Sequence, residues 1–327
     1  MNNSTEVKVG FIGAGGIANA HMENLATFED VEISAICDVD KNIAEERSDA
    51  FGGATYSDFE EMLKREPIDA LYICTPPFAH GEQEKKAAAM KIPLFIEKPI
   101  AVTLEQALSI LNAVENAGII TSVGYHWRYS AATARALHEL RGKKILGALG
   151  YWLGGMPGPP WWRVRAQSGG QHSEQTTHIF DICRYIVGNQ VKSVHGVANS
   201  GGMTDIPNYD VDDISVVNLE FENGVAANIS SCCVSAGPGR AGIEIFCRDL
   251  LIGITGKGGF EKKSSGEEDT SLDGYQEIDR DRVFIDAVKT GDSSPIRSNY
   301  ADALATLRVT LAASESFRTG EVVHLSD

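Results

Sequence analysis

The sequence lacks a long hydrophobic run and an excess of basic residues, and both absences exclude classes of protein. No apolar stretch approaches the roughly 18 residues of a membrane-spanning helix, so we expect no membrane association. The first residues show no basic region followed by an apolar run, and we therefore expect no signal peptide. The 29 lysines and arginines against 45 aspartates and glutamates give a formal charge of −16, which argues against nucleic-acid binding.

The sequence also lacks cysteine motifs, because its six cysteines form neither a C-x-x-C pair nor the spacing of a zinc site. Cys37, Cys74 and Cys183 lie in strongly apolar segments, and we interpret them as buried thiols. Cys232 and Cys233 are adjacent in a predicted strand, where alternation places one inward and one outward, and we interpret both as structural. This usage of cysteine indicates a reduced, cytoplasmic protein.

What is present is the composition of a globular protein. The 327 residues are 43% hydrophobic and 23% charged, and the length predicts two domains. The first 125 residues alternate between short apolar runs and segments of helical period. The predicted strands are Val7–Ile12, Glu32–Cys37, Ala54–Tyr56, Ala70–Cys74, Leu94–Ile96 and Ile119–Val123, and the predicted helices are Gly16–Phe28, Lys41–Phe51, Asp58–Arg65, His80–Met90 and Leu104–Ala117. Alternation of this kind indicates an α/β domain with a parallel sheet covered on both faces.

The pattern changes after Gly124, where strand-like segments follow one another. A helix is predicted at Ser130–Arg141, then the apolar run Ile145–Leu153, a loop rich in Gly, Pro and Trp at 154–170, and a helix at His172–Val187. The predicted strands that follow are Val191–Ala198, Ile214–Phe221, Val225–Cys232, Ile243–Cys247 and Leu250–Ile254. Residues 257–279 are predicted as an exposed loop or hairpin and 283–319 as a helical tail. The second domain is therefore predicted as α+β with an antiparallel sheet.

The first candidate binding motif along the chain is rich in glycine. It is Gly13-Ala-Gly15-Gly16-Ile17-Ala18, and it lies between a predicted strand and a predicted helix. Gly13 permits a tight turn and Gly15 allows backbone N–H groups to approach a pyrophosphate at the helix N-terminus. Asp38 ends the next strand, where a carboxylate accepts hydrogen bonds from the ribose hydroxyls and repels a 2′-phosphate. The motif predicts NAD rather than NADP.

Two further motifs end neighbouring strands of the same sheet. Thr75-Pro76 follows one strand and leads to His80, and Glu97-Lys98-Pro99 follows the next. Open α/β sheets bind ligands at this carboxyl edge. Burying an ammonium group is costly, so Lys98 should either pair with a carboxylate or face a substrate.

A third cluster lies in the second domain, where Glu174, His178 and Asp181 are spaced to share one face of a predicted helix. The cluster is either an ordinary solvated face or an acid–base face turned toward a cleft. No other group of His and Cys residues supports a metal site, and we expect none.

Together these motifs resemble those of the Gfo/Idh/MocA family, named for glucose-fructose oxidoreductase, inositol dehydrogenase and a rhizopine catabolism protein. The resemblance covers nearly the whole chain, including the Gly124-Tyr-His-Trp-Arg128 junction and the Trp162-Arg163 pair. It implies a Rossmann domain at 1–124 and an α+β domain at 125–327 with a large open sheet that forms a homodimer or homotetramer. The C-terminal helical tail could return to the first domain.

The resemblance also implies the site residues and the reaction, which is NAD(P)-dependent oxidation or reduction of a sugar, cyclitol or related polyol. Lys98 is the implied catalytic lysine, His178 the acid/base and Glu174 the carboxylate beside it. Asp181 has either a substrate contact or a role in helix packing, and Glu174 departs from the Asp of many relatives. The expected cofactor-binding residues are Gly13, Gly15, Gly16, Ile17, Asp38, Thr75, Pro76, His80, Glu97, Lys98, Arg128, Trp162 and Arg163, and the expected substrate-binding residues are Lys98, Glu174, His178 and Asp181.

The chemistry of these side chains suits hydride transfer. His178 can accept the hydroxyl proton near neutral pH, Glu174 would orient it, and Lys98 would stabilise the negative charge that develops on the oxygen. Two alternatives share the scaffold. One is a lyase or glycosidase that oxidises, eliminates and re-reduces without consuming NAD, and the other is a non-catalytic sensor of NAD or a sugar. The particular sugar or polyol is not readable from the sequence.

Overall fold

The computed structural model describes residues 6–325 and divides into two compact units. The first contains the described residues up to Gly124 together with Asp279–Ala303, and the second contains Tyr125–Ile278 and the residues from Leu304 onward. Among the described residues no helix is both long and apolar enough to cross a membrane.

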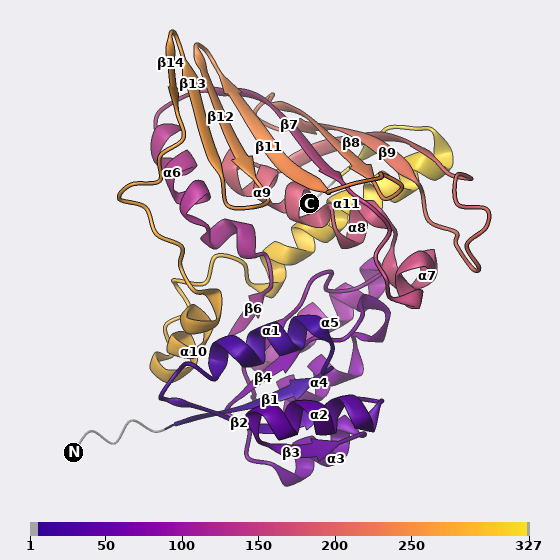
Figure 1. Ribbon diagram of the computed structural model, residues 1–327, viewed down its shortest axis with the longest axis vertical. Coiled ribbons are helices and arrows are strands. Elements are labelled where there is room, and N and C mark those ends of the chain that lie inside the picture. Colours follow the sequence, from indigo (N-terminus) through magenta and orange to yellow (C-terminus); the bar gives the residue numbers. More distant parts are fainter. Residues whose placement is uncertain (1–5, 326–327) are drawn as a thin grey trace. The chain divides into compact units, whose positions relative to one another are not determined.

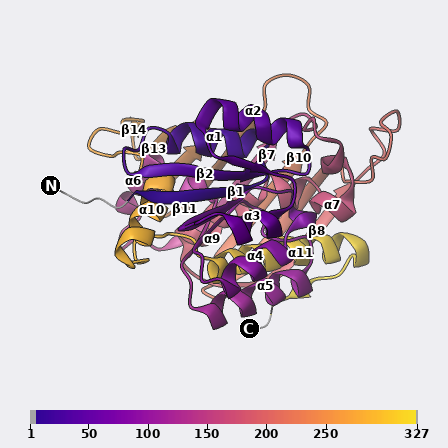
Figure 2. The ribbon, with the colours of Figure 1, turned by 90° about the horizontal axis from the view of Figure 1, so that it is seen from below.

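The first unit is built on a six-stranded parallel sheet in the order β3-β2-β1-β4-β5-β6. Its strands are β1 (Val7–Ile12), β2 (Val31–Cys37), β3 (Ala54–Tyr56), β4 (Ala70–Ile73), β5 (Leu94–Ile96) and β6 (Thr121–Val123). Its helices are α1 (Gly16–Leu25), α2 (Lys41–Phe51), α3 (Phe59–Arg65), α4 (Glu82–Ala89), α5 (Leu104–Ala117) and α10 (Arg280–Thr290), with a 3₁₀ turn η1 at Pro77–Ala79. Figure 2 shows α1 and α2 on one face of this sheet and α4 and α5 on the other. The predicted doubly wound α/β fold is therefore confirmed.

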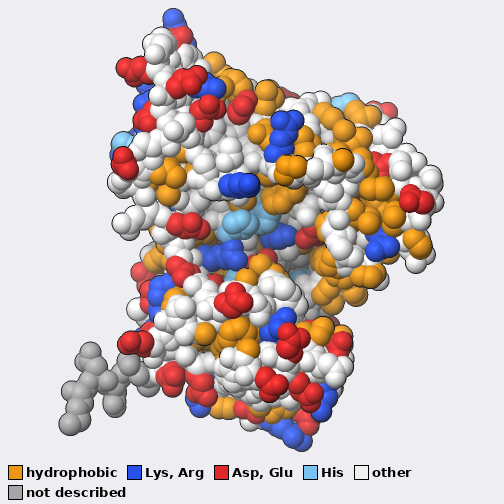
Figure 3. All heavy atoms as spheres, in the orientation of Figure 1, with side chains coloured by type: hydrophobic (Ala, Val, Ile, Leu, Met, Phe, Trp, Pro, Cys, Tyr) orange, Lys and Arg blue, Asp and Glu red, His pale blue; other side chains and the backbone are white. Residues whose placement is uncertain are grey.

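The elements of the first unit follow the local sequence closely. Asp40, Asp58 and Thr103 accept hydrogen bonds from backbone N–H groups at the starts of α2, α3 and α5. The helix predicted at His80 begins only at Glu82, because Gly81 adopts a φ of 135° that no helix allows. Figure 3 shows acidic and basic side chains intermixed over one face of this unit, so the net negative charge is not gathered in one block there.

One element of the first unit comes from far along the chain. Helix α10 packs Phe284 and Ile285 into the same core as Val9, Phe11 and Tyr72. Its N-cap Asp279 accepts hydrogen bonds from two backbone N–H groups of the helix and also from the side chain of Asn24 on α1. The predicted tail is thus two helices, and the first of them completes the core of the nucleotide-binding sheet.

The second unit is built on a nine-stranded sheet in the order β14-β13-β12-β11-β7-β10-β9-β8-β15. Its strands are β7 (Ile145–Leu153), β8 (Val191–Asn199), β9 (Ile214–Phe221), β10 (Ala226–Cys232), β11 (Arg240–Cys247), β12 (Leu250–Thr255), β13 (Phe260–Ser264), β14 (Glu267–Asp269) and β15 (Val323–His324). All pairs are antiparallel except β7 with β10. The α+β expectation is confirmed, and the 257–279 segment contains the hairpin β13–β14.

The helices of the second unit cover one face of this sheet. They are α6 (Ala131–Glu139), α7 (Arg165–Ser168), α8 (Gln171–Glu174), α9 (Thr177–Val187) and α11 (Tyr300–Thr319), whose first residues belong to the first unit, with 3₁₀ turns η2 (His126–Tyr129) and η3 (Pro160–Arg163). Side chains of α6, α9 and α11 share a core with the inward side chains of the strands, and Figure 1 shows these helices on one side of the sheet. Along β9 buried and exposed side chains alternate strictly, so the opposite face is open.

One prediction in this unit is wrong, because the helix expected at His172–Val187 is interrupted. Helix α8 ends at Glu174 and α9 begins at Thr177. At the interruption the N–H of Thr176 bonds the carbonyl of Gln171, five residues back, while the N–H of Ile179 bonds that of Thr176, only three back. The segment Ser-Glu-Gln-Thr-Thr has two neighbouring β-branched residues of low helix propensity, which makes the break inexpensive.

Candidate active site

The glycine loop of the first unit has the geometry of a pyrophosphate cradle. Gly13 has a φ of 88°, and a Cβ there would lie 2.7 Å from the carbonyl oxygen of Cys74, so only glycine fits. Gly15 caps α1 without a side-chain hydrogen bond, and a Cβ on Gly15 or Gly16 would meet open space. Ile17 beside them is exposed. The first turn of α1 has no acidic residue, so its N-terminus is open to an anion.

Asp38 lies at the end of β2 next to this loop. One carboxylate oxygen accepts the N–H of Ala14 at 2.8 Å and the other accepts the N–H of Asp40 at 2.9 Å. Through these two hydrogen bonds the half-buried Asp38 holds both the glycine loop and the turn after β2 in place. A carboxylate held at this position fits the ribose hydroxyls of NAD.

Thr75, Pro76 and His80 follow β4 at the carboxyl edge of the sheet. The Thr75 hydroxyl donates to Gln83 at 3.2 Å, and Pro76 leads into η1. The buried His80 has Nδ1 2.5 Å from Glu84, and its carbonyl oxygen accepts the side-chain amide of Gln106 at 2.6 Å. These contacts join the loop after β4 to α4 through Glu84 and to α5 through Gln106.

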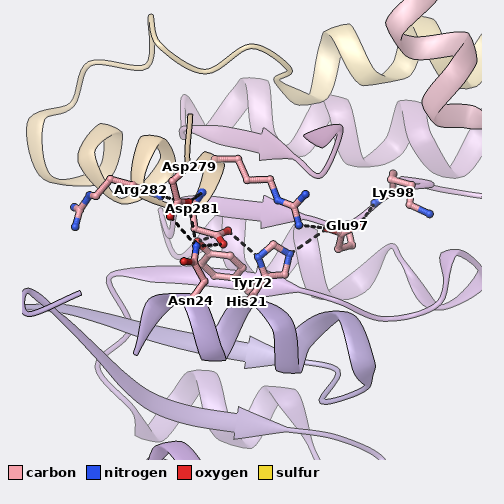
Figure 4. A network of polar contacts seen from close by, with 9 residues as sticks. His21, Asn24, Tyr72, Glu97, Lys98, Asp279, Asp281 and Arg282 are labelled. Atoms are coloured by element: carbon pink, nitrogen blue, oxygen red, sulfur yellow. Dashed lines mark hydrogen bonds and ion pairs between the residues drawn. The ribbon is translucent and has the colours of Figure 1, made fainter. Parts of the chain in front are cut away.

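Glu97 and Lys98 follow β5 at the same edge. Glu97 is buried, and its Oε2 accepts the backbone N–H of Lys98 at 3.2 Å. Burial favours a raised pKa for Glu97, but hydrogen bonding to His21 and the charges of Arg280, His21 and Lys98 outweigh it and lower the pKa to about 2. Lys98 is half-buried, and Figure 4 shows its side chain extending away from the His21–Glu97 contact.

His178 of the second unit lies in an aromatic setting on α9. It is 5% exposed, and its ring stacks on Trp152 of β7 with centroids 5.7 Å apart. The rings of His126 and Tyr125 meet it edge-on at 4.6 Å and 6.0 Å. The plane of the imidazole is therefore fixed by three neighbouring rings.

Glu174 does not share a helix with His178, because α8 ends at Glu174 itself. Its Oε2 accepts the indole N–H of Trp162, which is almost fully buried, at 2.8 Å. Arg163 follows in η3, and its carbonyl oxygen accepts the N–H of Asp210. The prediction that Glu174, His178 and Asp181 lie on one face of a continuous helix is therefore wrong.

Asp181 lies in a buried ion pair with Arg128. The Arg128 guanidinium donates from Nε at 2.7 Å and from Nη2 at 2.6 Å, one bond to each carboxylate oxygen. The Thr306 hydroxyl adds a bond to Oδ1 at 2.9 Å, and Arg184 in turn donates to that hydroxyl at 2.7 Å. Of the two roles left open for Asp181, this geometry favours packing, since α9, η2 and α11 meet at its carboxylate.

Several residues around these sites were not singled out from the sequence. Trp152 and His126 frame His178, and His21 lies between Glu97 and Asp281. A signal for His21 was present, because it falls in the buried stripe of α1 with Ala18, Met22 and Leu25 and so needs a polar partner. No local pattern indicates Asp281, which is 260 positions away from His21.

Fold and site define a class of protein, the dinucleotide-binding oxidoreductases. The glycine loop and Asp38 fit NAD, and residues 7–125 match the family model described as an oxidoreductase family with an NAD-binding Rossmann fold. Residues 144–250 match the Gfo/Idh/MocA C-terminal domain. The chain belongs to the Gfo/Idh/MocA family, as its motifs predicted.

Two named relatives match nearly the whole chain. It is 27% identical to scyllo-inositol 2-dehydrogenase (NAD(+)) of Bacillus subtilis, over 98% of this chain and 96% of that protein. It is 25% identical to myo-inositol 2-dehydrogenase of Thermotoga maritima, over 98% and 99%. A structure of levoglucosan dehydrogenase with NADH and L-sorbose superposes with a TM-score of 0.86 at 20% identity, covering 98% of this chain and 99% of the other.

Proposed function

We propose that the protein oxidises a secondary hydroxyl of a cyclitol, sugar or related polyol to a ketone, with NAD as the acceptor. The observation that carries this proposal is the buried His178, whose ring is fixed by Trp152, His126 and Tyr125. In the overall reaction a C–H and an O–H bond break, a C=O bond forms, and NADH and one proton are produced. The names of the two inositol dehydrogenases that match nearly the whole chain support the substrate class.

His178 is the proposed base. A histidine has an ordinary pKa near 6.5, so it can accept the hydroxyl proton near neutral pH without large tuning. Stacking on Trp152 restricts ring rotation, which keeps the accepting nitrogen in one orientation. Glu174, fixed by the Trp162 indole, is proposed to supply the negative charge that favours the protonated imidazole.

Lys98 is the proposed electrostatic group. Its ammonium would donate a hydrogen bond to the substrate oxygen and stabilise the negative charge that develops as the proton leaves. Its backbone N–H is already held by Glu97, so its starting position at the end of β5 is fixed. Bound NAD supplies the hydride acceptor, and the residues proposed to hold it are Gly13, Gly15, Gly16, Ile17 and Asp38, with Thr75 and Pro76 at the next strand end.

The experiment that tests the proposal begins with a screen of NAD reduction, followed at 340 nm, against inositols, free sugars, anhydrosugars, glycosides and nucleotide sugars. We expect net NADH formation with at least one cyclitol or pyranose. A glycoside that is cleaved without net NADH would contradict the dehydrogenase and favour the redox-neutral lyase. Tight NAD binding with no turnover of any compound in the panel would contradict an enzymatic function and favour the non-catalytic sensor.

With the substrate in hand, Lys98→Ala and His178→Ala should each lower kcat at least about 100-fold, the usual scale of acid–base and electrostatic contributions. NAD affinity, measured by titration calorimetry, should remain within about threefold for His178→Ala, since its proposed role is in the proton transfer. A kcat near that of the wild type in either variant would remove that residue from the mechanism.

We also propose that the protein is cytoplasmic, where its six free cysteines stay reduced. We further propose that it forms a homo-oligomer through the exposed face of the nine-stranded sheet. Leu149, Val197, Ile214 and Val216 are exposed apolar side chains on these strands. Val216 stands opposite Val197 in the β8–β9 register, so part of this apolar surface is continuous. Light scattering after size exclusion should show a dimer or tetramer that Val216→Lys dissociates, and a monomeric wild type would contradict the proposal.

A further inference from the structure

A group of four charges, three of them buried, lies behind Lys98 in the first unit. His21 on α1 is 1% exposed, with Nδ1 2.7 Å from Asp281 of α10 and Nε2 3.1 Å from Glu97. Arg280 lies 3.8 Å from the same oxygen of Glu97. Figure 4 shows His21 between the two carboxylates, with Lys98 on the far side of Glu97.

The geometry favours one protonation state of the group. A neutral imidazole has one N–H donor and one lone pair, and an ionised carboxylate can only accept. Both nitrogens of His21 face carboxylate oxygens, so a neutral ring would set its lone pair against an acceptor. The imidazolium has two donors, and with Arg280 it makes two cations against the two anions Glu97 and Asp281. The four charges then cancel, which lowers the cost of burying His21, Glu97 and Asp281.

The surrounding groups favour the same state. Burial favours a lowered pKa for His21 and Arg280 repels its charge, but Asp281 and Glu97 outweigh both, and the pKa of His21 is raised. Burial favours a raised pKa for Asp281, yet His21, Arg280 and the amide of Asn24 lower it. Three more titratable groups lie beside the cluster: Tyr72, with its hydroxyl 3.4 Å from Asp281, Cys74, and Asp279, which shares the Asn24 amide with Asp281. Burial raises the pKa of Tyr72 far above neutrality. It therefore stays protonated.

Glu97 connects this cluster to the site. Its Oε1 meets His21, and its Oε2 accepts the backbone N–H of Lys98. The carboxylate is also confined sterically, because a Cβ on Gly124 would lie 2.3 Å from its Oε1. A change at His21 is therefore transmitted through one carboxylate to the peptide that carries Lys98.

We propose that His21, as an imidazolium bridging Glu97 and Asp281, is a positioning residue that sets the orientation of Lys98 through the Glu97 carboxylate. This inference rests on the proposed function of Lys98. Asp281 of α10 accepts the hydrogen bond from Nδ1 of His21 with its Oδ1. The side-chain amide of Asn24 donates to the other oxygen of Asp281 at 2.9 Å. The charge state of a buried helix residue thereby acts on a side chain that it does not touch.

Two conservative variants separate the halves of the bridge. His21→Gln places an amide N–H near the position of Nε2 and keeps a donor toward Glu97, whereas His21→Asn keeps the donor toward Asp281. We expect kcat to fall about tenfold or more in His21→Asn, the scale of a displaced catalytic group, and less in His21→Gln. The dissociation constant of NAD should stay within about threefold in both. Wild-type kcat in both variants, or a larger loss in His21→Gln than in His21→Asn, would overturn the proposal.

A double-variant cycle tests whether His21 acts through Lys98. In a Lys98→Ala background, His21→Asn should lower kcat no further, because the group that it positions is gone. A loss of the same factor in both backgrounds would overturn the positioning role while leaving the proposed function of Lys98 intact. Wild-type turnover by Lys98→Ala alone would instead refute that function, so the two failures are distinguishable.

The matched control for the His21 variants is Arg282→Gln. This substitution breaks the contact of α10 with Asp30 at 2.7 Å and leaves the contacts of His21 untouched, so kcat should stay within about twofold of the wild type.

The protonation state is measured on the wild type, with no variant and no substrate. The method is NMR of the ring nitrogens in protein labelled with ¹⁵N-histidine. A histidine with an ordinary pKa is only about one-tenth charged at pH 7.5. We expect one ring whose two nitrogens both carry protons at that pH. If the His21 variants fail to fold, this spectrum decides alone, since a set of eight histidines without such a ring overturns the bridge.

Discussion

The buried pair of Arg128 and Asp181 should be among the most expensive interactions to break in the second unit. Their side chains are 3% and 1% exposed, and two hydrogen bonds of 2.7 and 2.6 Å join them. Replacing Arg128 by Met keeps much of the side-chain volume but removes the guanidinium that donates to both oxygens of the buried Asp181 carboxylate. Removing one partner of such a pair costs about 3–5 kcal/mol.

For a unit of this size, each kcal/mol shifts Tm by about 2–4 °C, so Arg128→Met should lower it by about 6–20 °C. The assay is differential scanning calorimetry at pH 7.5. The control is Arg165→Met, which breaks the partly exposed pair with Asp212 and should cost about 1 kcal/mol or less. The double variant Arg128→Met/Asp181→Leu should be more stable than Arg128→Met alone, because it also removes the buried carboxylate that has lost its guanidinium partner. A loss below about 1 kcal/mol in Arg128→Met would refute the reasoning.

Three further predictions concern the first unit. Gly13→Ala should weaken NAD binding at least tenfold by calorimetry, because its Cβ would meet the Cys74 carbonyl, whereas Gly52→Ala, at a similar φ of 84° but in open space, should cost stability alone. Asp38→Ser should lower the ratio of kcat/KM for NAD over NADP, because the charge that repels a 2′-phosphate is gone, and an unchanged ratio would contradict this role. Hydrogen bonds from Arg282 and Lys289 lower the pKa of Asp30 to about 2, so its contribution is present above the unfolded pKa near 4 and lost as pH falls toward 2. Asp30→Asn should therefore destabilise the protein in urea at pH 7, and most of this difference should be gone at pH 2.

The glycine loop and the first sheet were predictable because each depends on neighbouring residues. Strand and helix periods and Gly13 at the turn are local signals, and the structure contains the predicted strands and helices of the first sheet with shifts of a few residues at their ends. The interrupted helix was not predictable from spacing, since residue spacing does not distinguish the bond from Thr176 to Gln171, five residues back, from a regular helical bond. Spacing of four and seven residues therefore indicated a shared helical face that Glu174 does not join.

The sequence by itself determined the fold class, the NAD-binding loop and the family, because these are encoded in residue types at fixed short spacings. Only the tertiary structure decided what the charged side chains do. It placed Asp181 against Arg128, Glu174 against Trp162, and His21 between Glu97 and Asp281. The physical reason is that a buried charge takes its role from its partner, and a partner such as Asp281, 260 positions away from His21, is brought near only by folding.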